Sequence, residues 1–299
     1  MCFRRVKLAD VDVGRLNIDQ IVAGTTLRRV ARPLQAGPNA TVVESATSTN
    51  DLAWQHLDAP DADGWVVFAE HQSQGRGRLG RSWAAPRGAG ILCSVLLIQP
   101  ETPMEGPDGG YGARLALAAG VAGHDAVEDA TGVAVELKWP NDLMVRGRKL
   151  GGILVESRAL PHGRAGPDGG AGARGTAYVI GLGLNCLQQG GHFGPDLGDG
   201  ATSLELLASD PVDRQAVARA LLVEIDRWCG GLEEVGTERL RRAWLQRAAP
   251  LGQRVRLVHA GRQYSGQVVD LDPTAALVVQ LDEGGRRLFD AAQTTILGR

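Results

Sequence analysis

The chain has 299 residues, and its 43% hydrophobic and 22% charged content is typical of a globular protein. Its 32 basic and 34 acidic residues nearly cancel, so no strong overall field attracts nucleic acid or a membrane surface, and we expect neither DNA nor a membrane as a partner. The start of the chain lacks the apolar core of a signal peptide, which predicts a cytoplasmic protein. The four cysteines form no CxxC pair, so neither a metal site nor a disulfide framework is expected.

Residues 1–40 are predicted to form an N-terminal extension. One short amphipathic helix fits residues 17–22, and Pro33, Gly37 and Pro38 then mark a linker. The basic side chains of this segment suggest a nucleic-acid arm, but no helix-turn-helix pair fits so few residues. A partly ordered extension is therefore the favoured interpretation.

Residues 41–249 alternate predicted strands and helices, which indicates one main domain built on a sheet. The predicted strands cover residues 41–43, 64–70, 91–98, 133–139, 153–157 and 177–183. The predicted helices run from Ser48 through Leu57, over residues 112–130, from Asp210 through Trp228, and around Leu240 and Trp244. The glycine-rich residues 161–176 are expected to form a mobile loop.

Residues 250–299 have a different sequence pattern from residues 41–249. Short alternating segments separated by Gly and Asp turns cover residues 254–259, 263–270, 276–281, 287–290 and 294–297. This pattern predicts a small antiparallel barrel appended to the main domain.

The most informative segment is the stretch Gly75-Arg76-Gly77-Arg78-Leu79-Gly80-Arg81-Ser82-Trp83. Its arginines repel one another, and its glycines supply no local order. The arrangement becomes favourable when a polyanion arrives, because backbone N–H groups and guanidinium groups then converge on phosphate. A dinucleotide fingerprint and a P-loop both nearly fit, but each requires a helix where residues 84–90 predict a turn. The segment is therefore predicted to be a phosphate-binding loop that joins two strands.

A second polar cluster follows the strand that ends on Lys138. Pro140 stops the ladder of hydrogen bonds, so Asn141 and Asp142 are expected at a turn at the edge of the sheet. Lys149 heads the next strand, and a hairpin would bring it close to the Asn-Asp pair. Further along, the glycines of residues 181–185 permit close approach of a ligand or of another backbone.

With these motifs in place, the chain resembles the biotin protein ligases. The motifs that match in order and spacing are Ser48-Thr49-Asn50, Glu70-His71-Gln72 through Trp83, Lys138 to Leu143, Lys149 to Glu156, and Gly181 to Asn185. The resemblance implies an α+β fold: a mixed β-sheet with packed helices, like the catalytic domain of class II aminoacyl-tRNA synthetases, over residues 41–249. It also implies an SH3-like C-terminal β-barrel over residues 250–299.

The resemblance further implies an ATP-dependent ligase that forms biotinyl-5′-AMP from biotin and ATP with Mg²⁺. The enzyme then transfers biotin to one lysine of the biotin carboxyl carrier domain of a carboxylase. The implied catalytic residues are Arg76, Arg78, Lys149 and Asp142, where Asp142 receives or orients the proton of the incoming lysine. The implied binding residues around the biotin head are Ser48, Thr49, Asn50 and Gln72, with Gly152 and Ile153 beside it. The loop contributes Gly75, Arg76, Gly77, Arg78 and Arg81, and Trp83 stacks on the ligand. Lys138, Asn141 and Lys149 lie near the reacting groups, and Gly183 and Asn185 lie on the ATP side.

Some alternatives stay open at this point. Many biotin ligases carry an N-terminal DNA-binding domain and act as repressors, but residues 1–40 lack that pattern, so no repressor activity is expected. A lipoate–protein ligase of the same superfamily is the nearest rival, and the arginine-rich loop ending in Trp83 favours biotin. A nucleic-acid-binding module is the rival from another class. We expect a monomer or a weak homodimer.

Overall fold

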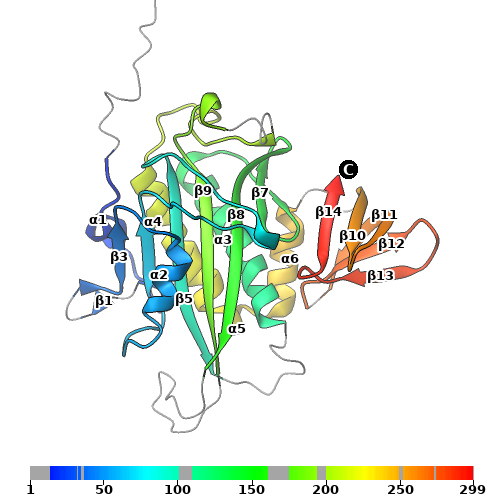
Figure 1. Cartoon of the computed structure of the whole chain (residues 1–299), viewed down its shortest axis with the longest axis horizontal. Coiled ribbons are helices and arrows are strands. Elements are labelled where there is room, and N and C mark those ends of the chain that lie inside the picture. Colours follow the sequence, from blue (N-terminus) through cyan, green and yellow to red (C-terminus); the bar gives the residue numbers. More distant parts are fainter. Residues whose placement is uncertain are drawn as a thin grey trace, which may run out of the picture.

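The computed structural model describes residues 14–298, except for residues 32, 35–36, 101–109, 161–174, 194–199, 249–251 and 273. A seven-stranded sheet with packed helices forms the larger part, and a smaller sheet follows at the C-terminal end (Figure 1). Most of the expected mobile loop at residues 161–176 lies outside the described residues. Within the described part of the chain, no helix is both long enough and apolar enough to cross a membrane.

The large sheet is mixed. Its strands, in spatial order, are β3 (Ala40–Val43), β4 (Val66–Ala69), β5 (Gly90–Pro100), β9 (Gly175–Asn185), β8 (Arg148–Ala159), β7 (Asp142–Val145) and β6 (Glu136–Lys138). The pair β3–β4 is parallel, and every other neighbouring pair is antiparallel. The loop of residues 75–83, which the sequence predicts to bind phosphate and to join two strands, and which is called the phosphate loop below, therefore lies between β4 and β5. These strands are hydrogen-bonded neighbours.

Helices cover both faces of this sheet. The main helices on one face are α3 (Tyr111–Thr131), α4 (Arg214–Ile225) and α6 (Thr237–Arg247), while α2 (Thr49–Gln55) lies on the other. Residues of β4 alternate between the two cores: Val66 and Phe68 pack with the α3 side, and Val67 packs with Trp54 of α2. Burial on both faces explains why β4 and β5 have nearly continuous apolar sequences.

Two glycines allow α3 to pack closely against the sheet. A Cβ atom added at Gly123 would lie 3.2 Å from a methyl group of Leu143, and one added at Gly120 would lie 3.7 Å from Leu137. The expected buried helix over residues 112–130 is thus confirmed, and its small residues set how near it lies to the strands.

The described part of the N-terminal extension is ordered against the main domain. Asn17 caps the short helix α1 (Ile18–Val22) by accepting a hydrogen bond from Gln20 N–H, and β1 (Pro33–Leu34) and β2 (Gly37–Pro38) form a small ladder. The buried carboxylate of Asp226 accepts three backbone N–H groups, from residues 28, 29 and 30, at 2.7–2.8 Å. This segment is therefore held by the helices that cover the sheet.

The structure differs from the sequence expectation at the helix expected from Asp210 and at the turn expected at Asp142. The helix expected from Asp210 begins at Arg214, because the Asp213 side chain accepts hydrogen bonds from Gln215 and Ala216 N–H and so provides the N-cap. It continues as one π-helical turn (Asp226–Gly230) and the short helix α5 (Leu232–Val235) before α6. Strand β7 was not predicted, because the turn expected at Asp142 is where this strand starts.

The C-terminal part is a five-stranded antiparallel sheet. Its strands are β10 (Arg254–His259), β11 (Arg262–Leu271), β12 (Leu277–Leu281), β13 (Arg286–Phe289) and β14 (Thr294–Gly298), in the order β13-β12-β11-β10-β14. All five predicted strands are present, but the described strands do not close into the expected barrel, because β13 and β14 remain at opposite edges.

The two sheets are tied together by specific hydrogen bonds. Arg241 of α6 donates to both carboxylate oxygens of Asp270 at 2.9 Å and to the carbonyl oxygen of Leu271 at 2.8 Å. Trp139 Nε1 donates to the carbonyl oxygen of Ala275 at 3.0 Å. The C-terminal sheet is therefore held beside the β6–β7 end of the large sheet.

Candidate active site

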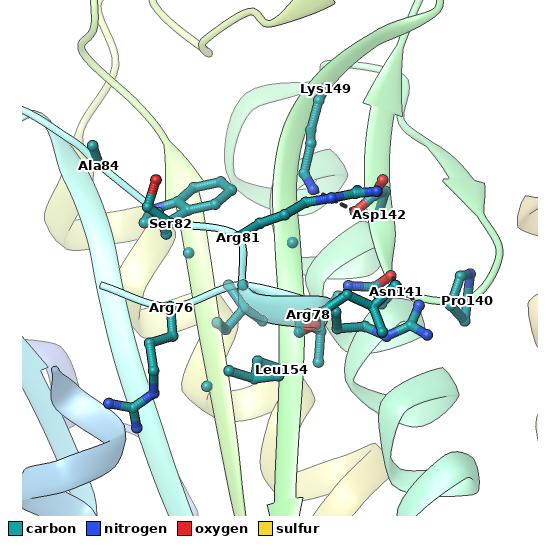
Figure 2. A pocket seen from close by; sticks show the side chains of 18 of the residues that line it. Arg76, Arg78, Arg81, Ser82, Ala84, Pro140, Asn141, Asp142, Lys149 and Leu154 are labelled. Atoms are coloured by element: carbon teal, nitrogen blue, oxygen red, sulfur yellow. Dashed lines mark hydrogen bonds and ion pairs between the residues drawn. The ribbon is translucent and has the colours of Figure 1, made fainter. Parts of the chain in front are cut away.

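A cavity of about 300 Å³ opens beside the phosphate loop, above strands β8 and β9 (Figure 2). Its volume lies at the lower end of the range for small-molecule sites. Of the residues predicted for the site, all but Gly75 line it: Ser48, Thr49, Asn50, Gln72, Arg76, Gly77, Arg78, Arg81, Trp83, Lys138, Asn141, Asp142, Lys149, Gly152, Ile153, Gly183 and Asn185. Segments far apart in the sequence therefore meet in one place.

One part of the cavity is lined by hydrogen-bonding side chains from the start of α2. Ser48 occupies the N-cap position of this helix but makes no side-chain capping bond, and Gln72 takes that role. The Gln72 Oε1 atom accepts the backbone N–H of Thr49 at 2.6 Å and lies 3.0 Å from the Thr49 hydroxyl. Asn50 is 3% exposed, and its Nδ2 atom has no hydrogen-bond partner within the protein. A buried amide nitrogen without a partner is costly unless a ligand supplies one.

The phosphate loop is an ordered hairpin. Gly77 N–H donates to the carbonyl oxygen of Arg81 at 2.7 Å, and Trp83 N–H donates to that of Gly75 at 2.8 Å. At its tip Leu79 has a φ of 56° and is 61% exposed. A Cβ atom at Gly75 would lie 2.3 Å from the Trp83 carbonyl oxygen, so only glycine fits there. Gly75 therefore closes the hairpin from outside the cavity.

Arg76 is directed away from the other loop cations (Figure 2). Its guanidinium group pairs with both carboxylate oxygens of Asp51 at 2.8–2.9 Å and with Glu156 at 3.2 Å. The hydrogen bond from Arg76 lowers the pKa of Asp51, and the same bond raises the pKa of Arg76. Glu156 also accepts a hydrogen bond from Trp54 Nε1 at 2.9 Å. In this arrangement Arg76 anchors the loop to α2 and β8.

Arg78 points to the opposite side, toward the C-terminal sheet. It donates to Asn141 Oδ1 at 3.1 Å and to the carbonyl oxygen of Ala291. Burial lowers the pKa of Arg78, with Asp142 acting against this and Arg81 adding to it. The guanidinium group remains charged, because the ordinary pKa of arginine lies so far above neutrality. Arg78 thus places a partly desolvated cation on the cavity wall.

Lys149 and Asp142 form the expected pair across the β7–β8 hairpin. Lys149 Nζ lies 2.6 Å from Asp142 Oδ1 and 5.7 Å from the ring centre of Trp83. Arg81 extends in the direction of this pair (Figure 2). Arg78, Arg81 and Lys149 therefore give one region of the cavity three positive groups, whereas Asp142 is the sole carboxylate among the described residues that line it. This region suits an anionic ligand.

The indole ring of Trp83 lies directly over β9. A Cβ atom at Gly183 would come within 2.4 Å of the ring, so this position has to lack a side chain. Asn185, at the end of the same strand, is 5% exposed and donates to the carbonyl oxygen of Thr202 at 3.0 Å. The close approach predicted for the glycines of β9 is accordingly filled by Trp83 and, at Gly181, by the side chain of Asn50.

Sequence reasoning missed several lining residues. The most distant in sequence are Thr294, Thr295 and Ile296 of β14, which bring the C-terminal sheet into the cavity wall. No local pattern marks them, because their place depends on how the two sheets dock. Gly181 was singled out only as a glycine that permits close approach, and the other lining residues that were not predicted for the site are Leu79, Ser82, Ala84, Trp139, Pro140, Leu154, Leu182, Phe193 and Ala201.

The described residues of the cavity offer few ligands for a metal ion. Within the residues that the structure describes, no three His, Cys, Asp or Glu side chains come together in a way that would hold one. Asp142 is itself occupied by Lys149. The residues present thus offer a cation at most one carboxylate here, so further ligands would have to come from an anionic substrate.

Two family models match the chain. Residues 42–165 match the biotin/lipoate A/B protein ligase family, and residues 251–293 match the biotin protein ligase C terminal domain. The matched segments include the loop, the β6–β8 hairpins and most of the C-terminal sheet.

Individual relatives agree with these matches. The chain is 35% identical over 260 residues to a biotin–[acetyl-CoA-carboxylase] ligase of Mycobacterium tuberculosis, covering 84% of this chain and 86% of that protein. It is 32% identical over 256 residues to the protein of that name from Paracoccus denitrificans, covering 82% and 95%. Its fold is similar to that of an Aquifex aeolicus biotin protein ligase solved with biotin and ATP, with a TM-score of 0.68, 23% identity, and coverage of 86% and 98%.

Proposed function

The chain belongs to the biotin protein ligase family and is an enzyme of that class, and on this premise we propose that it attaches biotin to a carrier protein in two steps. In the first step biotin and ATP give biotinyl-5′-AMP and pyrophosphate. In the second step a lysine of a biotin carboxyl carrier domain displaces AMP and keeps the biotin as an amide. The proposal rests on one observation: a single cavity joins a buried amide nitrogen without a partner, that of Asn50, to a region with three cations.

The polar residues at the start of α2 suit the head of biotin. The ureido group carries one carbonyl oxygen and two N–H groups, and it needs partners for all of them when it leaves water. Thr49, Asn50 and Gln72 offer hydroxyl and amide groups within one small region. Ile153, which is 2% exposed, and Gly152 supply an apolar wall beside them. These residues would fix the ring while the acid chain reaches toward the cations.

The cationic region suits the first chemical step. An oxygen of the biotin carboxylate attacks the α-phosphorus, and the bond from that phosphorus to the β-phosphate oxygen breaks, so that pyrophosphate leaves. Two anions must approach each other, and negative charge builds on the phosphoryl oxygens. Lys149, Arg78 and Arg81 would hold these oxygens and lower the barrier. Lys149 would exchange its bond to Asp142 for one to the substrate.

The loop and the C-terminal sheet would protect the product of that step. Biotinyl-5′-AMP is a mixed anhydride that water destroys, so a site that covers it has an advantage. Arg78 reaches Asn141 and the Ala291 carbonyl oxygen, so the loop, the β6–β7 turn and the C-terminal sheet already meet around the cavity. Trp83 would offer its ring face to the nucleotide.

In the second step the incoming lysine must be neutral before its nitrogen can attack the acyl carbon. The bond from that carbon to the AMP oxygen then breaks, and the amine loses a proton. Asp142 is the carboxylate in the cavity lining, and it becomes available when Lys149 turns to the substrate. We assign it the role of receiving or orienting that proton.

Magnesium would enter with the ATP substrate. Mg²⁺ in proteins is commonly bound by one or two carboxylates together with substrate phosphates. Asp142, the single carboxylate among the described residues of the lining, fits such a shared site rather than a cage made by the protein alone. When bound, the ion neutralises phosphate charge during the transfer.

The remaining parts of the proposal concern organisation. We assign residues 41–249 to the catalytic domain and residues 250–299 to the C-terminal domain, with residues 1–40 as an extension. We also propose that the enzyme works in the cytoplasm, as a monomer or a weak homodimer, on a carboxylase carrier domain.

ATP–pyrophosphate exchange tests the first step. The purified enzyme with Mg²⁺ and labelled pyrophosphate should incorporate label into ATP when biotin is added. Lipoate serves as the matched control acid, because the family model at residues 42–165 covers both biotin and lipoate ligases. Exchange that depends on lipoate and not on biotin would replace the proposal with a lipoate–protein ligase.

A further inference from the structure

Ser94 lies at the middle of β5 and is fully buried, at 0% exposed. It is not among the residues that line the cavity, yet its hydroxyl touches two residues that are. Ser94 Oγ lies 2.7 Å from Thr49 Oγ1 and 2.6 Å from Asn50 Oδ1. This serine therefore sits directly behind the polar wall of the site.

The side chains that run from Gln72 to Asn50 have too few hydrogen atoms to donate for all of their contacts. Three contacts run in series: Gln72 Oε1 to Thr49 Oγ1 at 3.0 Å, Thr49 Oγ1 to Ser94 Oγ at 2.7 Å, and Ser94 Oγ to Asn50 Oδ1 at 2.6 Å. Each contact between two oxygens needs one proton. The two amide oxygens have none to give, and the two hydroxyls have one each. With this orientation of both amides, one of the three contacts lacks a proton.

A half-turn of one amide group would supply the missing donor. The Gln72 amide cannot be the one that turns, because its oxygen accepts the Thr49 backbone N–H at 2.6 Å, and an NH₂ group there would face another donor. The Asn50 amide can turn, because its Nδ2 atom has no partner in its present position. After the turn, Asn50 Nδ2 donates to Ser94, Ser94 to Thr49, and Thr49 to Gln72. Every contact in the series then has one proton.

We propose that Ser94 is a positioning residue that holds the Asn50 amide with its nitrogen toward β5 and its oxygen as the atom offered to the ligand. The buried amide then acts as an acceptor, and it selects a ligand that carries an N–H group. This inference rests on the proposed function, since the cyclic urea of biotin has two such groups and the dithiolane ring of lipoate has none. Ser94 would thus contribute to the choice between these acids.

Neutron diffraction on a crystal of the deuterated protein tests the orientation directly, because nitrogen, oxygen and deuterium scatter differently. We expect the two deuterium atoms of the Asn50 amide on the side of Ser94, and the Ser94 deuterium directed at Thr49. Deuterium atoms on the opposite side, with the Ser94 deuterium directed at Asn50, would overturn the inference. This measurement needs no variant and no ligand.

The effect on selectivity is tested by calorimetric binding of biotin and of two analogues in which one ureido N–H or the other is replaced by oxygen. For one analogue, the wild type should lose about tenfold in affinity relative to biotin, the effect of one hydrogen bond. In Ser94→Ala that loss should shrink toward unity, because the released amide can turn and donate instead. A purely structural role would weaken all three ligands equally.

The matched control is Ser203→Ala, since Ser203 is also fully buried and its hydroxyl donates to the carbonyl oxygen of Gln188 at 2.6 Å, outside this series. Ser203→Ala should lose as much affinity for the analogue, relative to biotin, as the wild type does. Equal losses in the wild type and Ser94→Ala for both analogues would overturn the inference while leaving biotin binding intact. Absence of biotin binding by the wild type would instead overturn the proposed function itself.

Discussion

The ammonium nitrogen of Lys149 lies 2.6 Å from Oδ1 of Asp142, across the hairpin formed by β7 and β8. Each group therefore neutralises the other in the free enzyme. A substrate anion that takes Lys149 releases Asp142 at the same moment, so one exchange of partners would prepare both the cation for the first step and the carboxylate for the second.

Lys149→Ala should abolish adenylate formation. Loss of one fixed donor to the phosphoryl oxygens typically costs roughly 10²–10³-fold in rate. The measurement is single-turnover formation of biotinyl-5′-AMP, with circular dichroism to establish that the variant is folded. The neighbouring Arg148→Ala is the control, because Arg148 lies outside the cavity lining. Wild-type turnover in Lys149→Ala would remove this residue from the site.

Asp142→Asn should slow transfer to the carrier more than it slows adenylate formation. The amide keeps the shape of the side chain but cannot take a proton, and general-base contributions are typically about 10²–10⁴-fold. Transfer is measured with preformed biotinyl-5′-AMP and a carrier domain, so that the first step is bypassed. Glu136→Gln serves as the control, because Glu136 is an exposed residue of β6, the other neighbour of β7. Equal effects on the two steps would reduce Asp142 to a partner of Lys149.

Arg78→Ala should release the adenylate faster, while the enzyme stays folded. The variant loses a charged donor to the intermediate and also the contacts from the loop to Asn141 and Ala291, so we expect the dissociation rate to rise by at least about tenfold. The rate is measured by chasing labelled biotinyl-5′-AMP with unlabelled biotinyl-5′-AMP. Arg87→Ala is a control in the same connection between β4 and β5, since Arg87 binds Glu44 at the surface. An unchanged rate in Arg78→Ala would contradict its assigned role.

Arg241→Ala should weaken the hold of the C-terminal sheet on the site. The substitution removes the bidentate bond to Asp270 and the bond to Leu271, and β14 of that sheet lines the cavity. We expect faster release of the adenylate, by a smaller factor than in Arg78→Ala, and a lower Tm. Arg242→Ala on the same helix is the control, because its contact to Glu238 is exposed. An unchanged rate of adenylate release would mean that β14 shapes the cavity but does not help to retain the adenylate.

Three buried cysteines provide a pH-dependent test of the fold. Burial raises the pKa of the Cys186 thiol from its ordinary value of 9.0 to about 12, and it also raises the pKa values of Cys93 and Cys229. The folded state therefore favours the protonated thiol, so this contribution to stability is complete below pH 9 and is lost as the pH rises toward 12. Native protein at pH 8 should leave all three unreacted with iodoacetamide, and urea should expose them. Rapid labelling of native Cys186 would contradict its burial.

Much of the fold could be predicted because the local hydrophobic pattern of the sequence agrees with the burial of the same residues in the structure. The continuous apolar runs in β4, β5 and β9 mark strands buried on both faces, and Pro140 ends β6 where the sequence indicates. The meeting of Lys149 and Asp142 followed from a hairpin, which is a local structure. Strand β7 was missed because Asp142, expected to be part of a turn, is its first residue.

The remaining features depend on long-range docking, which local patterns do not encode. Arg76 was expected to be a catalytic and binding residue, but its guanidinium group meets Asp51 of α2 and Glu156 of β8, which the order of strands brings together. The contribution of Thr294 to the cavity depends in the same way on how the C-terminal sheet sits against α6 and β6. The unpartnered amide nitrogen of Asn50 is visible only once β5 and α2 are packed together.

The central claim is tested most directly by incubating the purified enzyme with biotin, ATP, Mg²⁺ and a biotin carboxyl carrier domain, and then mapping the product by mass spectrometry. The account predicts one biotin amide on a single carrier lysine, dependent on ATP and lost when that lysine is replaced by arginine. A carrier that stays unmodified with biotin but gains a lipoyl group when lipoate is supplied would contradict it.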